Sequence, residues 1–187
     1  MLDERDTLIE ALARLGDTLA DRDLHFHVAI VGGAALLLTG QISRPTQDVD
    51  VAAVATDGAL TSTWYLPDPL IEASRDVAVT LGLDPDWLNA GAVAVIGDDL
   101  PDGYETRLDS YRFGPLTVSV LSRLDLMGLK LLAAFDEGPH SQHVADLRAM
   151  ESTPDELEKA LRWALSRRDP NDPLVRSMVH HFTSSDG

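Results

Sequence analysis

The sequence has 187 residues, of which 31 are acidic and 15 basic, so its formal net charge is −16. At this length a single domain, or one domain with a small appendage, is expected, and 44% hydrophobic residues suffice for an ordinary core. The sequence contains no Cys, which excludes disulfide frameworks, thiolate metal sites and thiol nucleophiles, and its acidic charge opposes nonspecific binding to DNA, RNA or anionic lipid.

The N-terminal part of the sequence alternates helical and strand patterns. Apolar residues at helical spacing, an apolar run that ends at a glycine pair, and an alternating acidic and apolar run each predict one element. The predicted elements are a helix at 1–22, a strand at 25–31, a short helix at 34–38, a strand at 48–54 and a helix at 67–82. Gly40 is the expected stop of the short helix, and Pro67 and Pro69 suit the first turn of the last one. Residues 55–66 fit no clear pattern.

The C-terminal part of the sequence becomes helical after a hairpin. Gly114-Pro115 between two β-rich runs predicts the hairpin, and Thr153 before Pro154 predicts a capped helix start. The predicted elements are a short helix that starts with residues 86–89, strands at 106–113 and 116–121, and helices from 122, at 141–150 and at 154–167. The residues after 168, with Pro170 and Pro173, are expected to be loosely held.

This order of elements indicates the α+β, or mixed α/β, class, with helices that flank a small mixed sheet. We expect residues 1–121 to form an α/β core and residues 122–187 a helical region packed on it, in a single compact unit. The first twelve residues lack the features of a signal peptide, and no apolar run approaches the roughly 20 residues that cross a bilayer. A soluble, cytoplasmic protein with no membrane partner is therefore expected.

The most informative stretch for chemistry joins an apolar strand to Gly32-Gly33 and continues to Asp48-Val49-Asp50. Two carboxylates at alternate positions of a strand share one face, and they offer the hard oxygen ligands that Mg²⁺ prefers. Glycine at a helix start lets a phosphate approach the backbone, because no Cβ keeps it away. A tight turn followed by two solvated aspartates explains the same residues, and for Asp-x-Asp alone this plainer interpretation is favoured by about two to one.

The same stretch resembles the nucleotidyltransferase superfamily of the DNA polymerase β type. The fingerprint of that superfamily is an apolar strand, Gly-Gly or Gly-Ser, a short helix, and Asp-x-Asp on the next strand. The form found here is most similar to a bacterial group of small nucleotidyltransferases (DUF6036-like) akin to the AbiEii-type toxins of toxin–antitoxin systems. The segments 122–133 and 143–147 resemble the family's Leu-x-x-x-Lys-Leu-x-Ala helix and its later Lys-Asp-x-x-Asp-Leu segment. The resemblance therefore covers most of the chain.

The resemblance implies a role for each matching residue. The implied catalytic residues are Asp48, Asp50, Lys130 and Asp146, the implied nucleotide-binding residues are Gly32, Gly33, Arg44, Thr46 and Lys130, and the implied ligands of Mg²⁺ or Mn²⁺ are Asp48 and Asp50. Without the resemblance, Lys130 reads as a helix lysine that extends to solvent and Asp146 as a surface carboxylate. The histidines His140 and His143 lack partners at metal-ligand spacing and are expected to be structural or exposed to solvent.

One position departs from the pattern of the family. Many relatives carry a third carboxylate on a later strand, where this sequence has Ser119. Either Asp146 or Asp109 supplies the missing acid, or the site is weakened. A degenerate, non-catalytic module that binds a partner or serves as an antitoxin is therefore one alternative.

The reaction implied by the resemblance is the Mg²⁺-dependent transfer of a nucleoside monophosphate from a nucleoside triphosphate to an acceptor hydroxyl. A tRNA 3′ end or a protein is the acceptor if the chain is a toxin, and a cognate antitoxin is then a partner. An antibiotic hydroxyl is the alternative acceptor. The net charge weighs against tRNA, although Arg162, Arg167 and Arg168 offer a local basic edge.

Overall fold

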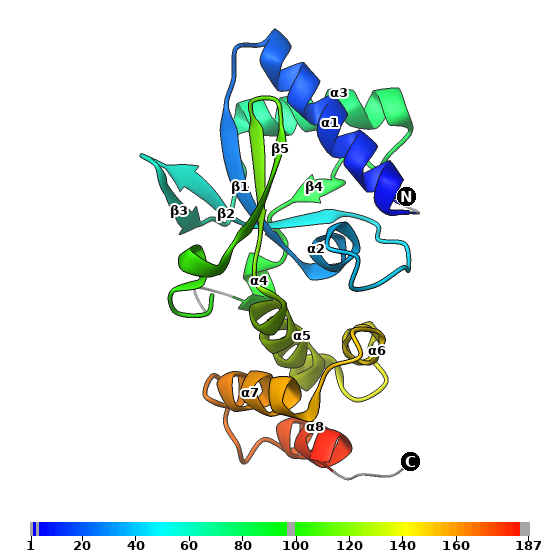
Figure 1. Ribbon diagram of the computed structural model, residues 1–187, viewed down its shortest axis with the longest axis vertical. Coiled ribbons are helices and arrows are strands. Elements are labelled where there is room, and N and C mark those ends of the chain that lie inside the picture. The colour runs from blue at the N-terminus through cyan, green and yellow to red at the C-terminus, as the bar shows by residue number, and fades with distance from the viewer. Residues whose placement is uncertain (1, 3, 97–99, 184–187) are drawn as a thin grey trace. The chain divides into compact units, whose positions relative to one another are not determined.

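The computed structural model describes residues 2, 4–96 and 100–183, and it has the α+β class predicted from the sequence (Figure 1). The chain divides into an N-terminal unit that ends at Ser122 and a C-terminal unit that begins at Arg123. The N-terminal unit contains the sheet, and the C-terminal unit is helical. No helix in the described part of the chain is long and apolar enough to cross a membrane.

A mixed sheet forms the centre of the N-terminal unit. Its strands in the described residues are β1 (Phe26–Val31), β2 (Val49–Thr56), β3 (Ala59–Ser62), β4 (Leu88–Asn89), β5 (Asp109–Phe113) and β6 (Leu116–Val120). The strand order is β3-β2-β1-β6-β5, and β4 pairs with β2 outside this path. Strand β1 runs parallel to β6 and antiparallel to β2, so the Gly-Gly end of β1 meets the acidic start of β2.

Helices cover one face of this sheet. The helical elements of the unit are α1 (Arg5–Asp21), α2 (Gly32–Leu38), α3 (Asp68–Leu81), α4 (Val93–Ile96) and the 3₁₀ helix η1 (Tyr104–Arg107). Helix α1 buries the leucines at its predicted apolar positions and packs beside α3 (Figure 1). At Gly16 it comes so close to β5 that an added Cβ would overlap the carbonyl oxygen of Phe113. Helix α1 therefore lies on the sheet face that carries the Phe113 side chain.

The strand register assigns Asp50 to the other face. Paired residues on neighbouring strands share a face, and successive residues alternate between faces. On the face that α1 covers, Phe113 of β5 pairs with Leu116 of β6, and Leu116 pairs with Phe26 of β1. The even-numbered residues of β1 therefore face α1. Val31 pairs with Asp50 and belongs to the odd-numbered set. The Asp50 carboxylate therefore extends from the sheet face that α1 does not cover.

Three expectations for the N-terminal unit need correction. The short helix predicted to start with residues 86–89 is wrong, because Leu88 and Asn89 form β4 and pair with β2. A two-residue strand has no periodicity to read, and Trp87 beside it is fixed by its indole nitrogen, which donates to the Ser74 carbonyl (2.8 Å). The strand expected at 106–113 begins only at Asp109, because Tyr104–Arg107 form η1. Residues 59–62, for which no element was expected, form β3. The helix expected at 34–38 begins two residues earlier, at Gly32.

The C-terminal unit is a cluster of helices around α5. Its helices are α5 (Arg123–Glu137), α6 (Gln142–Ala149), α7 (Pro154–Leu165) and α8 (Pro173–Thr183), and α5 contacts the other three. The predicted helix start at Thr153 is confirmed, since its side chain and that of Glu156 form a capping box.

The expectation of a loosely held segment after residue 168 is wrong for residues 173–183. Pro173 is tolerated at a helix start because the first N–H groups have no helical partner, and Asp172 Oδ1 accepts from the Leu174 N–H (2.8 Å). Val175 and Met178 on α8 are buried. Residues 184–187 lie outside the described residues.

Candidate functional site

The glycine pair at the start of α2 lies against the loop and strand that carry the aspartates. An added Cβ at Gly32 would lie 2.6 Å from Asp50 Oδ2. An added Cβ at Gly33 would lie 2.8 Å from Thr46 Oγ1 and 3.3 Å from Arg44 Nη2. The fold therefore brings together five residues that the sequence analysis selected, although the rest of helix α2 and the loop after it separate the glycines from Asp50 in sequence.

Asn89 connects the two aspartates of the site. Asp48 lies one residue before β2, and its Oδ2 accepts from Nδ2 of Asn89 (3.1 Å), which is the β4 partner of Asp50. Asn89 Oδ1 also accepts from the Gly91 N–H (2.7 Å), and an added Cβ at Gly91 would lie 4.0 Å from Asp50 Oδ1. Asp50 thus lies between two glycines, and Asn89 orients Asp48. The sequence analysis missed Asn89, because nothing in its neighbourhood predicts that it pairs with Asp50.

The loop before β2 is tied down at Thr46. Its backbone N–H and carbonyl pair with those of Leu2 (3.1 and 3.0 Å), and its hydroxyl donates to the Asp48 carbonyl (3.2 Å). Both Thr46 and Leu2 are buried. Arg44 donates from Nη1 to the Pro45 carbonyl (2.8 Å), while Nη2 lies close to Gly33. The loop therefore holds a hydroxyl and a guanidinium beside the start of α2.

An acidic cleft of about 400 Å³ opens beside Asp48. Its lining residues are Gln47, Asp48, Asp84, Asp86, Trp87 and Asn89. Three carboxylates in one cleft give it a negative potential, which attracts a divalent cation and repels a bare triphosphate. Charge therefore favours a metal-bound nucleotide over a free one at this position.

Asp48 and Asp50 fit Mg²⁺ as a donor pair. Mg²⁺ sites in proteins often use one or two carboxylates, and water and substrate phosphates complete the coordination. Both side chains are partly exposed and lie at one end of the sheet. Among the described residues, no group of three or more His, Cys, Asp or Glu side chains is arranged to hold a metal ion.

Ser119 is enclosed in a polar cluster. It is completely buried, and its Oγ lies 2.8 Å from both His27 Nε2 and Ser110 Oγ. Burial lowers the pKa of His27, so its ring is neutral at pH 7. Ser119 pairs with Ala29, two residues before Val31, the partner of Asp50, so Ser119 lies on the same sheet face as Asp50, two strands away. Its hydroxyl is held by His27 and Ser110, and the cluster offers no carboxylate for a metal ion.

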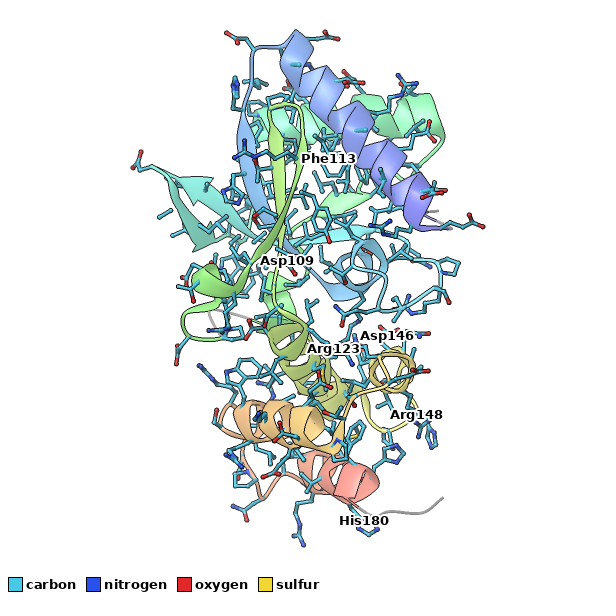
Figure 2. All side chains as sticks on the ribbon, viewed as in Figure 1. Asp109, Phe113, Arg123, Asp146, Arg148 and His180 are labelled. Carbon is cyan, nitrogen blue, oxygen red and sulfur yellow. The ribbon has the colours of Figure 1, made fainter. Side chains whose placement is uncertain are left out.

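Asp109 cannot complete the site either. It pairs with Val120, and Val120 pairs with Ile30, so all three belong to the sheet face that α1 covers. Asp50 lies on the opposite face. Figure 2 shows Asp109 at the start of β5, where it is exposed. The third carboxylate that many relatives carry is therefore not supplied by Asp109.

Lys130 and Asp146 form a buried ion pair within the C-terminal unit. Their Nζ and Oδ2 atoms are 2.7 Å apart, and the side chains are only 7% and 1% exposed. Gln142 donates to Asp146 Oδ1 (3.3 Å), and His143 Nδ1 lies 3.5 Å from Lys130 Nζ. Neither side chain extends to solvent. The interpretation of Lys130 as a solvent-exposed lysine and of Asp146 as a surface carboxylate is therefore wrong. A role for either residue toward nucleotide stays a prediction.

Acid is expected to weaken the C-terminal unit through His143. Burial lowers the pKa of His143, the Lys130 charge lowers it further, and Glu137 opposes both (Nε2 to Oε1, 3.2 Å). The unfolded chain, with a His pKa near 6.5, then binds the proton more readily than the folded one. The free energy of unfolding should therefore be highest above about pH 6.5 and fall as the pH drops toward the folded pKa.

Urea unfolding at pH 7 and pH 5.5 measures this effect. His143→Gln should reduce the difference in unfolding free energy between the two pH values. His140→Gln is the matched control, because His140 is exposed in the same unit. Equal pH dependence in wild type and in both variants would contradict the prediction.

If Asp48 and Asp50 hold a divalent cation, Gly32→Ala should weaken its binding more than it weakens the fold. The new methyl group would displace Asp50 Oδ2, and the φ of +73° strains any residue with a Cβ by about 1–2 kcal/mol. Gly40→Ala is the matched control, since it has φ +72° and open space around its Cβ. Calorimetric titration with Mn²⁺ and thermal unfolding of both variants separate the two effects. Equal loss of Mn²⁺ binding in both would show that backbone strain alone is responsible.

Comparison with known proteins agrees with this geometry at the level of the family. A family model described as "Nucleotidyltransferase of unknown function (DUF6036)" matches residues 6–146. The matched region contains the glycine pair, both aspartates, Asn89 and the Lys130–Asp146 pair. No curated protein and no solved structure matches the chain.

Proposed function

The chain belongs to the DUF6036 nucleotidyltransferases, and on that premise we propose that it transfers a nucleoside monophosphate from a nucleoside triphosphate to an acceptor hydroxyl. The observation that carries the proposal is the close approach of Gly32 to Asp50, with Asp48 held beside it by Asn89. Because Gly32 has no Cβ, the Asp50 carboxylate lies directly against the start of α2, so a phosphate on a metal held by Asp50 would meet the glycine backbone. A solvated acidic strand alone needs no such glycine.

Asp48 and Asp50 would hold the divalent cation. When bound, Mg²⁺ or Mn²⁺ would neutralise the charge of the phosphates and orient the α-phosphorus. Gly32 and Gly33 would admit the phosphate oxygens, and Arg44 beside Gly33 would contribute a guanidinium donor for them. The acceptor oxygen forms a bond to the α-phosphorus while the bond from that phosphorus to the bridging oxygen breaks. Pyrophosphate leaves, and the hydroxyl proton passes to solvent.

The acceptor class is proposed from the resemblance to AbiEii-type toxins. On that basis the acceptor is a tRNA 3′ end or a protein hydroxyl, and a cognate antitoxin would be the partner. An antibiotic hydroxyl needs no basic surface on the protein, and it is the alternative for a chain of net charge −16.

A non-catalytic binding module is the second candidate function. The observation that favours it is Ser119, which is buried and bonded to His27 and Ser110 where many relatives carry an acid. Such a module would bind a partner and transfer no nucleotide. Observation of Mg²⁺-dependent nucleotide binding would argue against this second candidate.

Calorimetric titration of the four nucleoside triphosphates tests the proposed function. Each is added to the purified full chain with Mg²⁺, and again with EDTA. We expect one nucleotide to bind with Mg²⁺ and binding to be lost with EDTA. If none of the four binds under either condition, the proposed transfer reaction is wrong and the binding module becomes the leading interpretation.

A further inference from the structure

The C-terminal unit contains a groove lined by an arginine and two histidines in an otherwise acidic chain. Its volume is about 570 Å³, within the usual range for small-molecule sites. The lining residues are Leu147, Arg148, Glu151, Ser152, Leu157, His180, His181 and Phe182. Figure 2 shows Arg148 on α6 and His180 on α8. Every lining residue belongs to the C-terminal unit, so the groove is independent of the aspartates in the other one.

Arg148 and His181 form the polar edge of this groove. Nη2 of Arg148 lies 2.8 Å from Nε2 of His181. A guanidinium can only donate, so the imidazole nitrogen accepts in this contact. An oxyanion placed beside Arg148 would receive the guanidinium donors in its place. The planar donor fork of Arg matches phosphate well, and this edge therefore suits a phosphate group.

Apolar and aromatic side chains also line the groove. Phe182 contacts His181 edge to face, with ring centroids 5.3 Å apart, and Leu147 and Leu157 line the same space. Aromatic and apolar side chains beside a phosphate-binding edge are the combination that binds a nucleobase by stacking. A simple inorganic anion would not use these side chains.

Glu151 introduces a strained acid into the groove. Its φ of +50° costs a residue with a Cβ about 1–2 kcal/mol, and it occupies the end of α6, where Gly is the usual residue. Strained residues concentrate at functional sites. A carboxylate repels phosphate but accepts hydrogen bonds from ribose hydroxyls, as acidic residues do in dinucleotide sites. Glu151 therefore fits the sugar portion of a ligand.

The charge of the chain is unevenly divided between its two units. The sequence to Ser122 has 20 acidic and 7 basic residues, whereas the sequence from Arg123 has 11 acidic and 8 basic residues and four of the six histidines. A polyanion meets far less repulsion at the C-terminal unit.

We propose that this groove binds a nucleoside phosphate. The phosphate lies at Arg148 and His181, the base against Phe182, and the ribose hydroxyls at Glu151. The ligand is either a free nucleotide or a nucleotide of a nucleic-acid strand. The inference goes beyond the proposed transfer reaction, because binding here needs neither Asp48 nor Asp50.

Binding of 5′-AMP and of a fluorescent single-stranded RNA to the full chain tests this assignment. Titrations in EDTA exclude the metal-dependent site. Arg148→Ala should weaken binding about tenfold or more, as expected for loss of a charged hydrogen bond. Arg162→Ala is the matched control, since Arg162 is exposed on α7, pairs with Glu158 and does not line the groove. His181→Gln, which keeps a side-chain acceptor, should preserve the fold and weaken binding.

Each outcome of the experiment is decisive. Loss of AMP binding in Arg148→Ala identifies a free nucleotide as a ligand, and loss of RNA binding alone identifies a strand. If neither probe binds at millimolar concentration, the proposal is wrong. It is also wrong if Arg148→Ala and Arg162→Ala weaken probe binding equally. A chain with Asp48→Ala and Asp50→Ala should still bind in EDTA, so a failed transfer reaction and a failed groove remain distinguishable. Circular dichroism of each variant confirms that it is folded.

Discussion

Asp50→Asn is expected to abolish Mg²⁺-dependent nucleotide binding and to lower nucleotidyl transfer by at least about 100-fold. Asn has nearly the same shape but no negative charge, and even residues that merely orient a metal ligand cost 10–100-fold when replaced. Asp48→Asn should have the same effect. Calorimetric titration with the preferred nucleotide, and transfer of label from its α-phosphate to total tRNA, measure the two quantities.

Asp86→Asn is the matched control for these variants. Asp86 lines the same acidic cleft and its replacement removes the same charge, but Asp86 is exposed and lies in the turn before β4, outside the strand that carries Asp50. Its activity should stay within a few fold of wild type. If Asp86→Asn lost as much as Asp50→Asn, the general negative potential of the cleft would explain the effect. Retained transfer in both Asp48→Asn and Asp50→Asn would remove the proposed mechanism.

Lys130→Ala is expected to reduce the free energy of unfolding by roughly 3–5 kcal/mol. The variant leaves the Asp146 carboxylate, which is 1% exposed, without the ammonium 2.7 Å away. Removal of one partner of a buried ion pair costs this much because the remaining charge stays desolvated. Urea unfolding of wild type and variant, followed by circular dichroism, gives the difference.

Two further variants separate stability from nucleotide binding. Lys130→Met combined with Asp146→Leu removes both charges and should restore most of the lost stability. Lys159→Ala removes an exposed i,i+4 partner of Asp155 and should cost less than about 0.5 kcal/mol. If Lys130→Ala keeps wild-type stability and instead weakens nucleotide binding, then Lys130 contacts phosphate, as the family resemblance implies.

Elements with a local sequence signal could be predicted, whereas those that depend on long-range pairing could not. The apolar repeat of α1 and the capping residues of α7 are local signals, and both helices lie where the pattern indicated. Strand β4 has two residues and depends on backbone pairing with β2, for which no local pattern exists. Helix α8 was missed because two prolines suggested a loop, although Pro173 suits a first turn.

The candidate site shows the same division between local and long-range information. Adjacent residues such as Gly32-Gly33 form a recognisable motif, and the register of β1 with β2 then places Gly32 against Asp50. Asn89 and the contact of Lys130 with Asp146 depend on pairings between distant segments. Burial of Ser119 likewise depends on His27 and Ser110, which lie on two other strands.

The pairing of Leu2 with Thr46 makes Leu2 part of the support behind the glycine pair. Thr46 reaches Gly33 with its hydroxyl and depends on Leu2 for both of its backbone hydrogen bonds. A change of backbone at Leu2, such as a proline that removes its N–H, would therefore reach the candidate site through Thr46, although Leu2 lies far from the aspartates in sequence.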